Sequence, residues 1–64
     1  MKKYTLTIEN QKTKEIRTAV VNSKTAQDAV TYVYSYAGEY DKVIEVIRGK
    51  GTVCTNWKYT QIRI

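Results

Sequence analysis

The first segment of the chain alternates between apolar and polar residues. Tyr4, Leu6 and Ile8 share one face of an extended chain, and polar residues occupy the positions between them. This period of two predicts a half-buried β-strand over residues 3–9. The polar residues 10–13 that follow predict a hairpin turn, because asparagine tolerates left-handed backbone conformations.

Residues 14–22 predict a second strand that pairs antiparallel with the first, because the connection between them is short. Ile16, Thr18 and Val20 share one of its faces, and Arg17, Ala19 and Val21 share the other, so neither face is purely polar. We expect Ile16 and Val20 to face the core and Arg17 to be exposed. A β-bulge near Ala19 would reverse that phase.

The next segment has the spacing of an amphipathic helix. Its apolar residues recur at intervals of three and four, at Ala26, Ala29, Val30, Val33, Tyr34 and Ala37. This stripe predicts a helix over residues 26–37. Thr25 with Asp28 resembles a capping box, with Ser23 as the alternative cap. Gly38 is expected to end the helix, because glycine adopts the left-handed closing conformation without steric cost.

The C-terminal half predicts two more strands. Residues 43–47 are rich in β-branched side chains, Gly49-Lys50-Gly51 is typical of a tight turn, and residues 52–64 continue in a strand-like composition with a bend near residues 56–58. The predicted order is β-β-α-β-β. It favours an α+β, two-layer fold in which one helix packs on one face of an antiparallel sheet, while the strand order stays open.

The 64 residues form one predicted domain, residues 1–64, without proline or a repeat. A chain of this size has a marginal core and often needs a disulfide, a metal or a partner. Cys54 is the single cysteine and histidine is absent, so an internal disulfide is excluded and a zinc site is not expected. We predict no cofactor and keep self-association as a hypothesis.

The sequence predicts a cytoplasmic protein without a membrane partner. No apolar run approaches the roughly 18 residues of a membrane span. Met1-Lys2-Lys3 resembles the start of a signal peptide, but the next residues form no apolar block, so we expect no targeting segment. Abundant Lys, Asn, Ile and Tyr are typical of AT-rich coding sequences, as in some bacteria and their phages.

The residue types argue against catalysis. Without histidine, the usual general base and a Cys–His nucleophile are both missing. Cys54 falls in a predicted strand, where a core role is favoured over a reactive thiol. Glu39 and Asp41 are the closest pair of acids, and two carboxylates do not make a metal site. Residues 49–51 lack the rest of a phosphate-loop motif. We therefore expect a non-enzymatic binding protein with no small-molecule substrate.

Nucleic-acid binding is the leading functional hypothesis. The chain carries 11 Lys and Arg against 6 Asp and Glu, for a net charge of +5, and basic and aromatic residues mix near its C-terminal end. The candidate residues are Arg17, Arg48, Lys50, Lys58, Tyr59 and Arg63. Strand alternation separates Lys58 from Trp57 and Tyr59, and we favour a core role for Trp57. The alternative is that the charge serves only solubility.

Protein interaction, as a homodimer or as a regulator of a larger protein, is the competing hypothesis. In the third predicted strand Val43 and Ile47 share one face, and apolar residues also occupy the other. A two-layer domain covers only one face of its sheet, so the second face is available to a partner. The candidate interface residues are Val43, Ile47, Tyr32 and Tyr36. Alternatively, neighbouring side chains shield that face.

Overall fold

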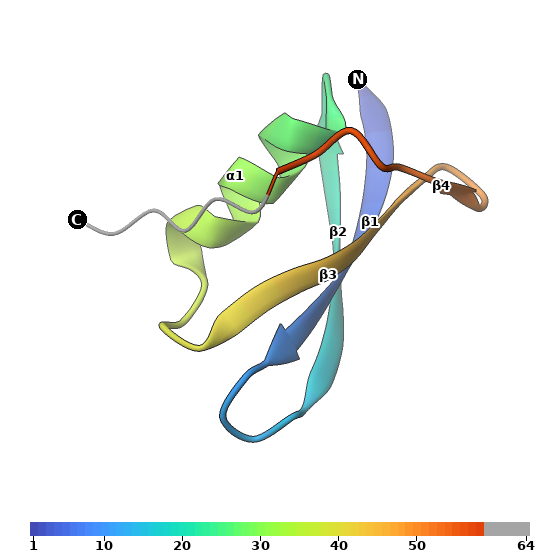
Figure 1. The fold of residues 1–64 in the computed structure, drawn as a ribbon. Helices are drawn as coiled ribbons and strands as arrows, with labels where there is room; N and C mark the ends of the chain where they lie inside the picture. Colours follow the sequence, from blue (N-terminus) through green and yellow to red (C-terminus); the bar gives the residue numbers. More distant parts are fainter. Residues whose placement is uncertain (59–64) are drawn as a thin grey trace.

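Within residues 1–58, four antiparallel strands form one sheet, and a single helix covers one of its faces (Figure 1). The computed structural model describes residues 1–58. The elements are β1 (Lys2–Asn10), β2 (Ile16–Ser23), α1 (Ala26–Tyr36), β3 (Asp41–Arg48) and β4 (Thr52–Val53). The strand order is β2-β1-β3-β4, so β1 lies at the centre between β2 and β3. The predicted fold class and element order are confirmed.

The core lies between β1, β3 and the apolar stripe of α1. Tyr4, Leu6 and Ile8 are buried, as their alternation predicts. The buried residues of the helix are Ala26, Ala29, Val30, Val33 and Tyr34. The Thr25 hydroxyl accepts a hydrogen bond from the Asp28 amide at 3.1 Å, so Thr25 is the N-cap. In residues 1–58, no helix has the length and apolar character needed to cross a membrane.

The end of α1 differs from the prediction. Ala37 turns into an extended conformation with φ −73° and ψ 158°, and Gly38 is not left-handed. The Gly38 amide instead donates to Asp41 Oδ2 at 2.8 Å, and the Asp41 amide donates to the Gly38 carbonyl at 3.2 Å. A Cβ at position 38 would lie 3.2 Å from Asp41 Oδ2. Glycine at position 38 therefore leaves room for the Asp41 carboxylate to lie close to the backbone.

The prediction that Ile16 and Val20 of β2 face the core is wrong, whereas Arg17 is exposed as predicted. Val21 is buried and Ala19 packs against the core, whereas Ile16 and Val20 are 54% and 61% exposed. The pairing with β1 explains this, because Val21 lies opposite Tyr4 and Ala19 opposite Leu6. Directly opposed residues of a sheet share a face, so these two follow the buried side chains of β1. The same register places Arg17 opposite Ile8, on the helix side of the sheet.

A β-bulge changes the phase of β3. Glu45 pairs with Thr7 and Val43 pairs with Ile8, so Ile44 is an extra residue without an opposite partner in β1. Val43 and Val46 consequently both face the helix and are fully buried, while Ile47 lies on the other face. The prediction that Val43 shares a face with Ile47 is therefore wrong. Val43 belongs to the core and offers no surface to a partner.

The two hairpin turns use different residues for positive φ. In the first turn the left-handed residue is Lys14, with φ 66°, rather than Asn10. Asn10 acts through its side chain, because its Oδ1 accepts from the amides of Lys12 and Thr13, each at 2.9 Å. The predicted glycine turn is confirmed, with φ 62° at Gly49 and 143° at Gly51.

The last strand is much shorter than predicted. β4 contains only Thr52 and Val53, and the chain then leaves the sheet edge toward the helix, as the orange-red segment in Figure 1 shows. The Cys54 amide still donates to the Val46 carbonyl at 2.8 Å, after which residues 55–58 have no regular structure. The remainder of the predicted strand, residues 59–64, lies outside the described residues.

Candidate functional site

Charged side chains are distributed unevenly between the two ends of the sheet. The end with the β1–β2 hairpin has equal numbers of cations and acids, namely Lys12, Lys14, Arg17 and Lys42 with Glu9, Glu15, Glu39 and Asp41. The opposite end, where β1 begins and β2 and β3 finish, has Lys2, Lys3, Lys24, Arg48 and Lys50. One acid, Asp28, lies in the first turn of α1, which begins at this end. We call this second region the basic end.

A small depression lies within the basic end. Lys2, Lys24 and Arg48 line it, and its volume is about 130 Å³. Lys2 and Arg48 reach it because β1 and β3 place both on the helix side of the sheet, and Lys24 directly precedes the N-cap of α1. No acidic side chain of the part of the chain that the structure describes lines it. Within residues 1–58, none of the three cations forms an ion pair. We call this hollow the basic depression.

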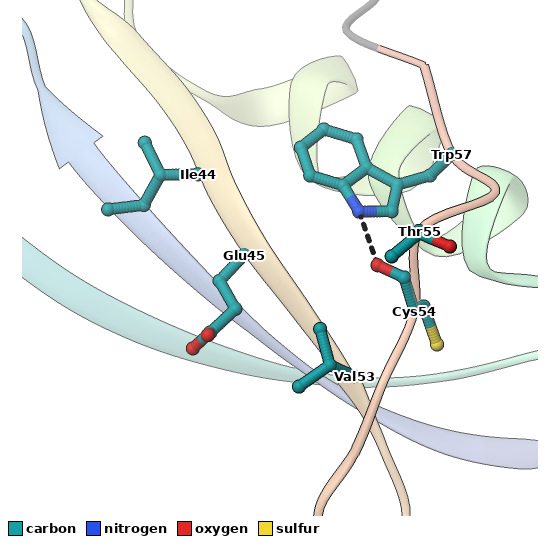
Figure 2. Close-up of a pocket in the computed structure, with 6 residues that line it drawn as sticks. All are labelled: Ile44, Glu45, Val53, Cys54, Thr55 and Trp57. Carbon is teal, nitrogen blue, oxygen red and sulfur yellow. Dashed lines mark hydrogen bonds between the residues drawn. The ribbon is translucent and has the colours of Figure 1, made fainter.

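A second hollow adjoins the first. It is a groove of about 350 Å³ between β3 and the segment that follows β4, and its lining residues are Ile44, Glu45, Val53, Cys54, Thr55 and Trp57 (Figure 2). Trp57 is half-buried and packs partly against the core, and its indole Nε1 donates to the Cys54 carbonyl at 3.1 Å. Cys54 lines both hollows, so the two are neighbours. We call the second hollow the indole groove.

The segment carrying Trp57 is fastened to the helix. The Lys58 amide donates to Gln27 Oε1, and Gln27 Nε2 donates to the Lys58 carbonyl at 3.3 Å. Gln27 belongs to the first turn of α1, so Lys58 lies close to the basic end. Of the predicted nucleic-acid residues, Arg48 and Lys50 lie at the basic end, and Lys58 lies beside the first turn of α1. Tyr59 and Arg63 lie outside the described residues.

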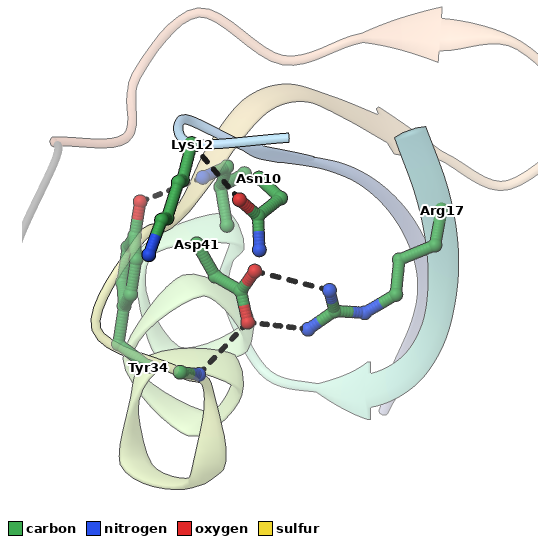
Figure 3. Close-up of polar contacts among 7 residues, drawn as sticks. Asn10, Lys12, Arg17, Tyr34 and Asp41 are labelled. Atoms are coloured by element: carbon green, nitrogen blue, oxygen red, sulfur yellow. Dashed lines mark hydrogen bonds and ion pairs between the residues drawn. The ribbon is translucent and has the colours of Figure 1, made fainter. Parts of the chain in front are cut away.

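Arg17 lies at the end of the sheet with the β1–β2 hairpin, and its guanidinium forms an ion pair with Asp41. Its Nη1 donates to Asp41 Oδ1 at 3.0 Å and its Nη2 to Asp41 Oδ2 at 2.6 Å (Figure 3). These hydrogen bonds hold the pKa of Asp41 below its ordinary value, although burial acts in the opposite direction. The same bonds raise the pKa of Arg17. Arg17 was predicted to bind nucleic acid together with Arg48, but the two lie at opposite ends of the sheet, and the Arg17 guanidinium is paired with Asp41.

The candidate protein-interface residues do not form one surface. Ile47 lies on the open face of the sheet, while Tyr32 and Tyr36 lie on α1, which covers the opposite face. The two tyrosine rings pack edge to face with centroids 5.3 Å apart. The open face carries a row of paired residues across all four strands, Val20, Thr5, Ile47 and Val53. The row is a better candidate interface than the predicted set.

Sequence reasoning missed Lys2 and Lys24 because the strand order was unknown. Once β1 is central, its first residues must lie beside the end of β3 and the start of α1. No group of three or more potential metal ligands occurs within residues 1–58. Comparisons with protein-family models, curated proteins and solved structures gave no match.

Proposed function

We propose that this protein binds nucleic acid, with its basic end against the phosphate backbone. The observation that supports this most is the separation of charge along the sheet. At the end with the β1–β2 hairpin, acids equal the cations in number. In the basic depression, Lys2, Lys24 and Arg48 lie together without an acid from residues 1–58. Clustered cations of this kind attract a polyanion and release its counterions on binding.

The basic residues contact two neighbouring phosphates of the backbone. The cations of the basic depression hold one phosphate group, and Lys50 reaches a neighbouring phosphate from the tip of the β3–β4 hairpin. Gly49 and Gly51 shape that tip and are exposed, which allows the backbone of a ligand to approach closely. Such contacts position a nucleic acid without reading its sequence, so we expect little sequence preference from the basic end itself.

The proposed activity is binding rather than catalysis, in a cytoplasmic protein. The chain has no histidine, and its single thiol lies at Cys54, which packs against the core. Its six acids include Asp41, which the Arg17 ion pair occupies. These features offer a nucleic acid a charged surface and no evident nucleophile or general base.

Fluorescence anisotropy with labelled oligonucleotides tests the proposal. Duplex DNA, single-stranded DNA and RNA of equal length are titrated at low and at near-physiological salt. We expect at least one of them to bind at both salt concentrations, and Lys24→Gln and Arg48→Gln to weaken binding. Lys12→Gln and Lys14→Gln each remove the same charge at the other end of the sheet, beside the β1–β2 hairpin, and should change the affinity little. Equal losses from both pairs, or no binding at all, would contradict the proposal.

A second candidate function is self-association through the open face of the sheet. Val20 and Val53 are 61% and 56% exposed and lie in one row with Ile47, which is unusual for a face turned to water. Sedimentation equilibrium of the parent and of Val20→Glu tests it. A concentration-dependent dimer that Val20→Glu dissociates would support this candidate, and a parent that stays monomeric would exclude it.

A further inference from the structure

We infer that the indole groove receives an unstacked base, so that the preferred ligand of the protein is a single-stranded nucleic acid. This inference rests on the proposed function, because it assumes that a phosphate group occupies the neighbouring basic depression. It adds the strandedness of the ligand and a base-binding role for Trp57, Val53 and Glu45.

The two neighbouring hollows differ in chemistry as the two halves of a nucleotide do. The basic depression presents Lys2, Lys24 and Arg48, which suits a phosphate. Among residues 1–58, the indole groove presents mostly apolar side chains, the Thr55 hydroxyl and one carboxylate, that of Glu45, which disfavours a phosphate. Since Cys54 belongs to both linings, a strand whose phosphate lies in the depression can place an adjacent base in the groove.

Trp57 has the properties of a stacking platform. In Figure 2 the indole lies over the groove, with Ile44 and Glu45 across from it and Val53 on the β4 side. Its only polar group, Nε1–H, is already bonded to the Cys54 carbonyl. The ring is therefore held in place, and its remaining interaction with a ligand is through its π face. Stacking on such a ring is available to every base and does not require a particular sequence.

Glu45 gives the groove a preference among bases. Within residues 1–58 its carboxylate forms no ion pair, and it lies on the wall of the groove. A carboxylate accepts hydrogen bonds from exocyclic amino groups, such as N4 of cytosine. Thymine has no amino group. A cytosine strand should therefore bind better than a thymine strand, and Glu45 is the residue that distinguishes them.

The geometry also explains why a duplex should bind less well. A base can enter the groove only when its faces and its pairing edge are free, which is true of single strands. In a duplex the phosphates can still reach the basic depression, but the bases stay stacked inside the helix. Duplex binding would then lack the contribution of the indole groove.

Trp57 is the single tryptophan of the chain, so its intrinsic fluorescence reports directly on the groove. The full chain is titrated with end-labelled oligocytidine, oligothymidine, an abasic strand of the same length and a duplex, recording label anisotropy and tryptophan emission together. We expect oligocytidine to quench the emission and to bind about five- to a hundredfold more tightly than the abasic strand, as base–aromatic stacking implies. Oligothymidine should bind with intermediate affinity.

Two variants assign the effect to residues. Trp57→Leu keeps an apolar side chain against the core and should lower oligocytidine affinity toward that of the abasic strand, whereas Tyr32→Leu, on the outer face of α1, should not. Glu45→Gln should reduce the preference for cytosine over thymine. Circular dichroism checks the fold, and the quenching of the parent protein decides the matter if Trp57→Leu is unfolded.

The outcomes separate this inference from the proposed function. Equal binding of the abasic and base-containing strands, an unquenched Trp57, or a preference for duplex would overturn the inference and leave phosphate binding intact. Absence of binding by every oligonucleotide at both salt concentrations would overturn both.

Discussion

The ion pair between Arg17 and Asp41 makes the stability of the fold testable through one substitution, Asp41→Asn. The Asp41 side chain is buried and accepts three hydrogen bonds, two from the Arg17 guanidinium and one from the Gly38 amide. Asparagine has one side-chain oxygen, so the variant loses the charge and leaves at least one of these donors without its acceptor.

The magnitude follows from the exposure of the partners. A buried polar group that loses its partner costs about 1–3 kcal/mol. The Arg17 side chain is 51% exposed, so water can solvate the freed guanidinium and the upper limit does not apply. We expect Asp41→Asn to lower the free energy of unfolding by about 2 kcal/mol. For a domain of this size, that corresponds to a fall in Tm of roughly 8–16 °C.

The same substitution should change the dependence of stability on pH. The Arg17 hydrogen bonds hold the pKa of Asp41 below its ordinary value, so the folded state binds the proton less readily than the unfolded state. The contribution of the pair is therefore complete above the unfolded pKa of about 3.9 and is lost as the pH falls through the lower folded pKa. The variant has no such group and should lose less stability in acid.

Urea unfolding followed by circular dichroism, at neutral pH and at steps from about pH 5 to pH 2.5, measures both effects. Glu15→Gln is the control, because it removes a carboxylate at the same end of the sheet that is exposed and unpaired within residues 1–58. An Asp41→Asn protein as stable as the parent at neutral pH, with the same loss in acid, would refute the structural role of the pair.

Three further predictions test other parts of the structure. Val21→Thr should destabilise the protein by about 1–3 kcal/mol in urea unfolding, whereas Val20→Thr should cost less than about 0.5 kcal/mol, because only Val21 faces the core. Gly38→Ala should cost about 1 kcal/mol in the parent and less in an Asp41→Gly background, measured as a double-mutant cycle, because its Cβ would crowd the Asp41 carboxylate. Asp28→Asn removes an acid in the first turn of α1, next to the basic end, so the oligonucleotide affinity measured by fluorescence anisotropy should rise. An unchanged affinity would speak against binding at the basic end.

An element can be predicted from the sequence when its pattern of apolar and polar residues fits only one arrangement in the fold. The alternation of Tyr4, Leu6 and Ile8 with polar residues fits only one strand orientation, and the α1 stripe begins at a threonine cap. In β2 both faces are apolar, so the choice between Val20 and Val21 depended on pairing with β1, which a single sequence does not reveal. The bulge at Ile44 leaves no sequence signal, since every nearby residue is a plausible strand residue.

The candidate site was only partly predictable for the same reason. Arg48 and Lys50 were identified from local composition, but Lys2 and Lys24 join them only through the strand order. The charge of Arg17 alone groups it with these residues, whereas its pairing with Asp41 is a contact between residues distant in the sequence. The apparent conflict between Trp57 as a core residue and as a ligand contact disappears, because the ring packs partly against the core and also lines the groove.

The most direct measurement of the proposed binding is the salt dependence of oligonucleotide affinity in charge variants. If Lys2, Lys24 and Arg48 hold one phosphate of a single strand and Lys50 contacts a neighbouring one, the logarithm of affinity should fall against the logarithm of salt concentration with a slope of about −1.4, from roughly 0.7 per neutralised phosphate. Lys50→Gln removes the contact with one of the two phosphates and should make that slope shallower by about 0.7, whereas Lys12→Gln should leave it unchanged. A slope near zero, or an equal change from Lys12→Gln, would contradict phosphate binding at the basic end.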